Sequence, residues 1–192
     1  MATPIPMQKR PVAKANQNQV EQAISFFKTK LGWVGLHSVP KGVLHVRFGY
    51  SRKSDVESAC VPFGVGNWTD TRHERWVQWF QRYSDGEPID LARIPLAAET
   101  QLTSFAQSVR RALQAVPWGE TLSYGQLAIL AGRPGAARAV GTVMRKNETP
   151  LIVPCHRVLA SCGLGGFSSH RGTEMKRRLL ELEGSWNEGG LG

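Results

Sequence analysis

The sequence predicts an α+β fold, in which a first half of strands and helices is followed by a mainly helical second half. Three patterns support this class. Apolar residues alternate with small or polar ones along Val43–Tyr50, which is the period of a strand with one buried face. Apolar residues recur at helical spacing from Leu102 to Leu113. Two more short helical patterns lie on either side of Arg133-Pro134-Gly135, and together they predict a helix-turn-helix.

The composition is that of a soluble globular protein with an excess of positive charge. The 192 residues include 24 Lys and Arg against 15 Asp and Glu, a formal net charge of +9. This length supports one large domain or two small ones. The charge favours a polyanionic partner, and nucleic acid is the commonest one. Because the sequence has no long apolar span and no signal-type segment, we expect a cytoplasmic protein with no membrane partner, associated with the nucleoid if it is bacterial.

The cysteines and histidines do not form a recognisable ligand set. Cys60, Cys155 and Cys162 make no Cys-x-x-Cys pair and cannot all be bridged to one another, which is typical of free thiols in a reducing compartment. The five histidines show no ligand spacing. We therefore expect no metal and no cofactor, and we interpret Cys60 as structural.

The chain divides into four predicted segments. Residues 1–20 combine prolines, basic residues and a polar run, and they predict a flexible basic leader. An N-terminal α/β domain is expected over 21–97, a C-terminal domain over 98–184 and a tail over 185–192.

A predicted β-hairpin dominates the first domain. Trp33–Val39 and Val43–Tyr50 flank the turn residues Pro40-Lys41-Gly42. The residues expected to face the core from the second strand are Leu44, Val46, Phe48 and Tyr50. A helix is predicted over Arg72–Tyr83, and its aromatic stripe is more typical of a core than of a platform for nucleic-acid bases. Extended chain is expected from Pro88 to Leu96.

The second domain begins with a helix that ends before Pro117, because proline disfavours helical conformation in the residue that precedes it. Ser123 is then expected to cap a helix that carries Tyr124 and ends at Gly132. The next helix is predicted over Ala136–Arg145.

This last helix has a small and basic surface. Its small residues are Ala136, Ala137, Ala139 and Gly141, and its projecting charges are Arg138 and Arg145. Such a surface can approach a phosphate backbone or a narrow groove closely. Close packing of two helices is the alternative explanation.

One segment carries the most distinctive chemistry. The apolar run 151–153 predicts a short buried strand that stops at Pro154, which lacks a backbone donor. A thiol, an imidazole and a guanidinium follow at Cys155, His156 and Arg157. Neighbouring side chains of a strand point to opposite faces, so His156 can reach Cys155 only if the backbone turns here. The pattern indicates a nucleophilic cysteine beside its base; the alternative is an inert buried cysteine beside a surface histidine.

Two features after this segment complete the candidate site. The Gly/Ser-rich loop Ser161–Ser169 can close over a pocket, although it matches neither a P-loop nor a dinucleotide fingerprint. A final helix is predicted from Thr173 to Glu183. Glu183 lies at the end where the helix dipole disfavours a carboxylate, which makes it a candidate to orient the imidazole.

An ordered set of motifs resembles a known family. The motifs are PWGETLSY at 117–124, ARAVG at 137–141, Asn147, IVPCHRV at 152–158 and LLELE at 179–183. They are similar to those of the 6-O-alkylguanine-DNA alkyltransferases, also called methylated-DNA–protein-cysteine methyltransferases. The resemblance covers about residues 99–184. It implies a small ribonuclease-H-like N-terminal domain, followed by a winged-helix-like domain for DNA binding and the active site.

The resemblance implies a DNA repair enzyme that acts once. An alkyl group would pass irreversibly from the 6-oxygen of guanine, and also from the 4-oxygen of thymine, to Cys155. His156 would deprotonate Cys155 through a water held by Asn147, Glu183 would orient His156, and Tyr124 would protonate the leaving guanine. The damaged nucleotide must leave the base stack, because the duplex screens its alkyl group.

The resemblance also implies which residues bind DNA and the base. The expected DNA-binding residues are Tyr124, Arg133, Ala136, Ala137, Arg138, Gly141, Arg145 and Ser161. Arg138 would fill the space of the everted guanine. The expected walls of the guanine pocket are Arg157, Val158, Phe167 and Ser168. The implied partner is double-stranded DNA containing alkylated guanine, bound by a monomer without cofactor.

The chain departs from the family pattern at four places. Glu148 follows Asn147 where proline is usual, and Phe167 replaces a tyrosine. Arg110 occupies a position commonly held by tryptophan, and Ser169-His170-Arg171 stands where a glycine pair is expected. Two other functions compete with alkyl transfer: a DNA lesion sensor that transfers nothing, and a thiol hydrolase that turns over many substrates.

Overall fold

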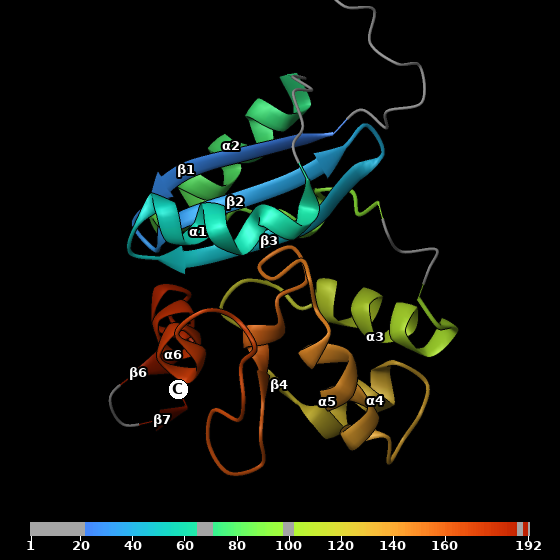
Figure 1. Ribbon diagram of the computed structural model, residues 1–192. Helices are drawn as coiled ribbons and strands as arrows, with labels where there is room; N and C mark the ends of the chain where they lie inside the picture. The colour runs from blue at the N-terminus through green and yellow to red at the C-terminus, as the bar shows by residue number, and fades with distance from the viewer. Residues whose placement is uncertain (1–21, 65–70, 98–101, 188–189, 192) are drawn as a thin grey trace, which may run out of the picture.

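The structure is a computed structural model that describes residues 22–64, 71–97, 102–187 and 190–191, so the predicted leader lies outside the described residues. The strands are β1 (Ala23–Thr29), β2 (Gly32–Val39), β3 (Gly42–Tyr50), β4 (Leu122–Ser123), β5 (Val158–Leu159), β6 (Trp186–Asn187) and β7 (Gly190–Leu191). The α-helices are α1 (Lys53–Cys60), α2 (Thr71–Ser84), α3 (Ser104–Gln114), α4 (Tyr124–Leu130), α5 (Ala137–Arg145) and α6 (Gly172–Leu182). Figure 1 shows β1–β3 with α1 and α2 in its upper half, and α3–α6 in its lower half. This mixture of helices and small sheets confirms the predicted combination of α and β structure.

The larger sheet is antiparallel, in the order β1-β2-β3. Its β2 and β3 are the predicted hairpin, whereas the sequence pattern does not predict β1. The pairing shifts within the hairpin: His37 lies opposite His45 but Ser38 lies opposite Val43, so Leu44 is an extra residue in β3. Val43 is therefore fully buried and Leu44 only half-buried, and the core position predicted for Leu44 belongs to Val43.

Helices cover both faces of this sheet (Figure 1). On one face, α1 approaches Gly35 so closely that a Cβ there would lie 2.6 Å from the Sγ of Cys60, which is buried. On the other face, α2 packs its aromatic stripe against the sheet, and its Phe80 and Tyr83 are buried in the core. The predicted helix over Arg72–Tyr83 is confirmed as α2; α1 is not predicted, because it buries only Val56 and Cys60 and has a weak apolar pattern.

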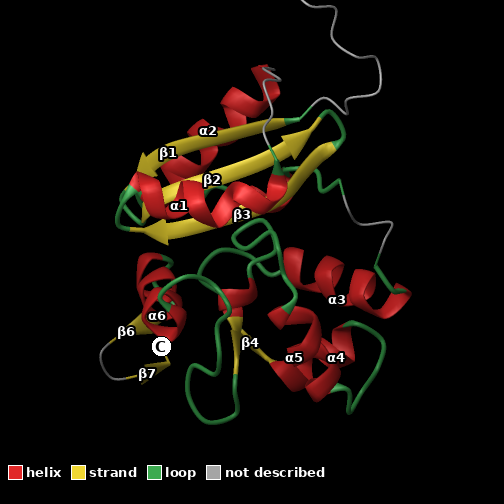
Figure 2. Cartoon of the chain, viewed as in Figure 1, coloured by secondary structure: helices red, strands yellow, loops and turns green. Residues whose placement is uncertain are grey.

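The second half is mainly helix and loop (Figure 2). The α4 helix has the predicted Ser123 cap, which forms a capping box with Gln126. Gly132 then takes a φ of 77°, which a glycine adopts without strain, and ends the helix. The next helix is α5, and α3 packs against both α4 and α5. The predicted pair of short helices joined by a tight turn is confirmed.

The apolar run before Cys155 is a buried turn rather than the predicted strand. Leu151 has a φ of 73°, and the only β-type pairing at 150–154 is an isolated bridge between Pro150 and Val153. The backbone then makes a 3-10 turn over Cys155–Arg157 before it enters β5, which pairs in parallel with β4. The strand prediction fails because an apolar run indicates burial and does not determine the backbone conformation. The predicted turn at Cys155 is present.

Two hydrophobic clusters meet at this turn. One joins β2, β3 and α2 to Ile152 and to Leu179 of α6. The other joins α3, α4 and α5 to Val153 and Cys155. The chain therefore passes from one cluster to the other immediately before the Cys-His segment, and α6 packs against the sheet. The division at residues 97 and 98 stays a prediction. Among the described residues, no helix is both long and apolar enough to cross a membrane.

Candidate active site

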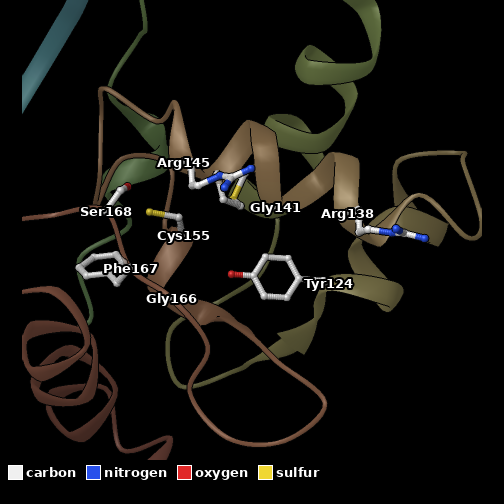
Figure 3. Close-up of a pocket in the computed structure, with 9 residues that line it drawn as sticks. Tyr124, Arg138, Gly141, Arg145, Cys155, Gly166, Phe167 and Ser168 are labelled. Carbon is white, nitrogen blue, oxygen red and sulfur yellow. The ribbon is translucent and has the colours of Figure 1, made fainter.

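A pocket of about 460 Å³ opens beside Cys155 (Figure 3). Its lining residues are Tyr124, Arg138, Gly141, Met144, Arg145, Cys155, Gly166, Phe167 and Ser168. Figure 3 shows the Tyr124 hydroxyl pointing toward the side of the pocket that holds Cys155, whereas Arg138 extends away from Cys155. A pocket of this size holds a small aromatic ligand such as a nucleobase.

The amide of Asn147 determines the surroundings of the Cys155 sulfur. Its Oδ1 accepts a hydrogen bond from the backbone N–H of Thr149 at 3.2 Å, and a backbone N–H can only donate. The Nδ2 group therefore faces the other way, and it donates to the carbonyl oxygen of Val153 at 2.9 Å and to Sγ of Cys155 at 3.2 Å. A donor directed at sulfur favours the thiolate over the thiol.

Burial nevertheless raises the pKa of the Cys155 thiol, although the hydrogen bond from Asn147 and the charges of Lys176 and Arg110 oppose this rise. Cys155 is only 5% exposed, and water does not solvate its anion well. The thiol is therefore the resting form, and a nucleophilic reaction requires a base.

His156 has the geometry of a neutral base. Burial lowers the pKa of the imidazole, even though Glu183 acts in the opposite direction. Nε2 lies 2.9 Å from Oε1 of Glu183, and an ionised carboxylate only accepts, so Nε2 carries the proton. Nδ1 then holds the free lone pair, and this buried atom has no hydrogen-bond partner among the described residues.

Glu183 is buried at the C-terminal end of α6 and is held by three neighbours. Arg157 donates to both of its carboxylate oxygens at 2.8 Å, and the Tyr83 hydroxyl donates to Oε1 at 2.5 Å. Burial alone raises a carboxyl pKa, but the hydrogen bonds and charges of His156 and Arg157 outweigh it and hold the pKa of Glu183 far below its usual range. The carboxylate is therefore ionised, and its position against the helix dipole is compensated by Arg157.

Arg157 and Val158 do not line the pocket beside Cys155. The guanidinium of Arg157 bonds to Glu183 and to the carbonyl oxygen of Val116 at 2.6 Å, and it lines a separate pocket of about 410 Å³. Val158 is fully buried in β5. Their side chains therefore lie elsewhere: the buried carboxylate holds Arg157, and Val158 is in the core where β5 pairs with β4. Their predicted role as walls of the guanine pocket stays a prediction. Phe167 and Ser168 do line the pocket.

Most of the predicted DNA-binding residues lie on α5 or in the turn that precedes it. Arg138 and Arg145 are exposed, and Ala136, Ala137 and Gly141 are half-exposed. A Cβ on Gly141 would lie 3.9 Å from the ring of Tyr124, an ordinary contact distance, so the small residue is not required by packing there. Ser161 is exposed on the following loop, and Arg133 lies over the ring of Phe105 at 5.0 Å.

The sequence pattern does not identify two further residues of the site. Lys176 is fully buried, and its ammonium donates to the carbonyl oxygens of Val158 and Leu164 at 2.5 Å; burial lowers its pKa to about 8. It fixes the start of the loop that carries Phe167. Tyr83 reaches Glu183 from α2. The sequence contains a signal for the burial of each residue. Lys176 shares a helix face with Leu179 and Leu180. Tyr83 belongs to the apolar stripe of its helix, and a buried tyrosine needs a partner for its hydroxyl.

Comparisons with known proteins agree on one family. The family model described as "6-O-methylguanine DNA methyltransferase, DNA binding domain" matches residues 104–185. The chain is 36% identical over 161 residues to a methylated-DNA–protein-cysteine methyltransferase of Saccharolobus islandicus, over 82% of this chain and 93% of that protein. It is similar to the crystal structure of Mycobacterium tuberculosis O6-methylguanine methyltransferase, with a TM-score of 0.63, 29% identity, and coverage of 84% of this chain and 92% of that one. It is also similar to Mycobacterium tuberculosis OGT in complex with DNA, with a TM-score of 0.59, 30% identity, and coverage of 82% and 90%.

Proposed function

The chain belongs to the 6-O-methylguanine-DNA methyltransferase family, the methylated-DNA–protein-cysteine methyltransferases, and from this membership we propose which of its residues perform the reaction. The protein repairs DNA by direct reversal, moving an alkyl group from DNA to one of its own cysteines. We assign the acceptor to Cys155. The observation that carries this assignment is that Cys155 lines the 460 Å³ pocket, whereas Cys60 is buried between α1 and the sheet and Cys162 lies exposed on a loop.

The transfer is a single displacement at carbon. The Cys155 proton passes through a water to Nδ1 of His156, whose other nitrogen is fixed by Glu183. The sulfur then forms a bond to the alkyl carbon while the bond from that carbon to the guanine 6-oxygen breaks, and its electron pair goes to the base. Burial raises the pKa of Tyr124, so its phenol is protonated before the reaction. It can then donate this proton to the leaving guanine. The product is a thioether, and none of the described residues that line the pocket is placed to cleave it.

Base flipping follows from the position of the sulfur. Cys155 is recessed in the pocket, and a guanine stacked in a duplex cannot bring its 6-oxygen that far. We propose that the everted base enters between Tyr124 and the Phe167–Ser168 wall, and that Arg138 occupies the space it leaves. The small residues of α5, of which Ala139 is exposed and Ala137 and Gly141 are half-exposed, support close approach to the minor groove. A flipped thymine alkylated on its 4-oxygen presents the same bond to the sulfur.

We propose the finer fold and partner assignments on the same basis. The antiparallel sheet with α1 and α2 supports a ribonuclease-H-like unit over 21–97, and α3–α5 with the β4–β5 pair support a winged-helix-like unit over 98–184. The partner is DNA, specifically double-stranded DNA containing alkylated guanine, and the protein acts as a monomer. One α5 surface and one pocket in each chain are sufficient for this reaction.

The proposed function is tested by stoichiometry. The intact protein is incubated with an excess of duplex DNA containing 6-O-methylguanine, and its mass is followed over time. The expected result is a plateau at about one methyl group per chain, located on the Cys155 peptide, because the product thioether is not turned over. Continuous demethylation without a mass change would indicate a hydrolase, and binding without a mass change would indicate a lesion sensor.

Replacing Arg138 with alanine is expected to slow repair of duplex DNA by about 10- to 100-fold, because the everted base then leaves a gap that nothing fills and unstacking is worth a few kcal/mol. Reaction with free 6-O-benzylguanine, which requires no flipping, is expected to change little. Both rates are measured by single-turnover kinetics. The matched control is Arg177→Ala on α6, which removes an equal charge from an exposed position. Equal losses on duplex and free base would contradict the assigned role of Arg138.

A further inference from the structure

Arg110 is a buried cation close to the reactive sulfur. It lies on the face of α3 that also carries Ala106, Val109 and Leu113, and it is 8% exposed. Its Nη2 donates to the Thr149 hydroxyl at 2.9 Å. Burying a guanidinium among apolar side chains is unfavourable unless its hydrogen bonds and charge are used. An apolar residue would satisfy the packing of this helix face, so packing alone does not explain an arginine.

A directed series of hydrogen bonds leads from Arg110 to Cys155. The guanidinium can only donate, so the Thr149 oxygen accepts from it and the Thr149 hydroxyl proton is free to point at Oδ1 of Asn147, 3.3 Å away. Oδ1 also accepts from the Thr149 backbone N–H. The opposite end of the same amide donates to the sulfur at 3.2 Å. Every donor in this series points toward Cys155, so each bond polarises the next in the same sense.

We propose that Arg110 is a positioning residue for the transfer reaction: through Thr149 it locks the Asn147 amide with its NH₂ group toward Cys155, and its buried charge stabilises the Cys155 thiolate. This role rests on the assignment of Cys155 as the alkyl acceptor. Without Arg110, Thr149 loses the donor that holds its hydroxyl oxygen, and its hydroxyl group can rotate away from Asn147. The amide would then be fixed on its oxygen side by a single backbone N–H.

The electrostatic surroundings of the sulfur agree with this role. The charge of Arg110 acts to lower the pKa of Cys155, together with the Asn147 hydrogen bond and the charge of Lys176, against the larger effect of burial. The Tyr124 hydroxyl of α4 also interacts with the sulfur, and because burial raises its pKa it is neutral. His156 follows Cys155 directly in the chain, and its charge state is set by burial and Glu183. Among the described residues, cations from two helices therefore favour the anion, Arg110 of α3 and Lys176 of α6.

The test measures the Cys155 thiol without DNA. Intact protein is treated with iodoacetamide between pH 6 and pH 10, and the rate of alkylation of the Cys155 peptide is followed by mass spectrometry. Arg110→Met removes the positive charge and the hydrogen-bond donors of the guanidinium, and it keeps an unbranched side chain. The expected result is an apparent thiol pKa about one unit higher, which is about tenfold less thiolate at neutral pH. The rate there falls about three- to fourfold, because a more basic thiolate is intrinsically more nucleophilic.

Two further variants separate this role from general destabilisation. Thr149→Val keeps the charge and breaks the series of hydrogen bonds, and it is expected to shift the pH profile in the same direction by a smaller amount. Arg110→Lys is expected to retain most of the wild-type profile. The matched control is Arg111→Met, an exposed arginine on the same helix. Thermal unfolding of each variant shows that the protein measured is folded.

An unchanged profile in Arg110→Met, or an equal shift in Arg111→Met, would overturn the proposal. Because iodoacetamide requires neither DNA nor an alkylated base, this result is independent of whether the wild-type protein accepts a methyl group from DNA. Failure of the stoichiometric experiment and failure of the Arg110 experiment are therefore distinguishable.

Discussion

Cys155→Ala is expected to abolish methyl transfer completely, with no methyl group gained per chain above background. Among the described residues that line the pocket, none replaces the sulfur, because Tyr124 is a neutral phenol and the Ser168 hydroxyl and the Met144 thioether are much weaker nucleophiles than a thiolate. The variant is expected to fold, since alanine fills most of the volume of a small buried thiol. The measurement is the intact mass after incubation with methylated duplex DNA.

Two matched controls use the other cysteines. Cys162→Ser removes an exposed thiol and Cys60→Ala removes a buried one, and both are expected to keep the full stoichiometry. DNA binding by Cys155→Ala, measured by fluorescence anisotropy, is expected to be close to that of the wild type because the α5 surface is unchanged. A methyl group found on Cys162 in the Cys155→Ala protein would contradict the assignment of the acceptor.

Glu183→Gln is expected to produce the largest loss of stability, about 3–5 kcal/mol in the free energy of unfolding, because it leaves Arg157 buried without its counter-charge. Repair is expected to be lost as well, since the amide no longer fixes the proton on Nε2 of His156. The measurement is urea unfolding at pH 7, with single-turnover repair on the same samples. Glu181→Gln is the matched control: it lies on the same helix, pairs with Arg177 at 3.7 Å in an exposed ion pair, and is expected to change stability by less than about 0.5 kcal/mol.

Glu183→Gln is also expected to change how the stability of the protein depends on pH. The carboxyl pKa of Glu183 is lower in the folded protein than in the unfolded chain, so its contribution to stability is complete above the ordinary carboxyl pKa and is lost as the pH falls below it. The wild type is therefore expected to lose stability between about pH 5 and pH 3, and Glu183→Gln to lose less over the same interval. Urea unfolding at intervals of pH measures both slopes, and parallel slopes would show that Glu183 does not carry the effect.

Helices with a strong apolar face could be predicted from the sequence, because local spacing reports burial directly. The helices α2, α3, α4, α5 and α6 are of this kind. Ser123 and Gly132 mark the two ends of α4, through side-chain capping and backbone preference. The pairing of β2 with β3 is also local. The strand β1 and the helix α1 could not be predicted, because their burial depends on the rest of the sheet rather than on their own pattern.

The candidate site was partly predictable for a similar reason. The motif around Cys155 identifies Cys155, His156 and Arg157 directly. Glu183 stands out because it lies at a helix end where a carboxylate is unfavourable. The direction of the Arg157 side chain depends on its contact with Glu183, which is distant in the sequence. Sequence spacing does not contain that information. The same holds for Lys176, whose partners are three backbone carbonyls of a loop. The turn at Leu151 requires a positive φ in a leucine, which propensities do not suggest.

The Tyr83 hydroxyl joins the half of the protein that holds the sheet to Glu183 and His156, the residues that we propose for proton transfer. It donates to Glu183 and lies 3.4 Å from Nε2 of His156, while the α6 residues Met175 and Leu179 share a core with β2 and β3. A chain shortened to the region matched by the family model would expose those apolar side chains to water and take one donor from the carboxylate. The site that we propose for catalysis thus depends on both halves of the chain: β2, β3 and α2 form a scaffold for chemistry that residues of the second half would perform.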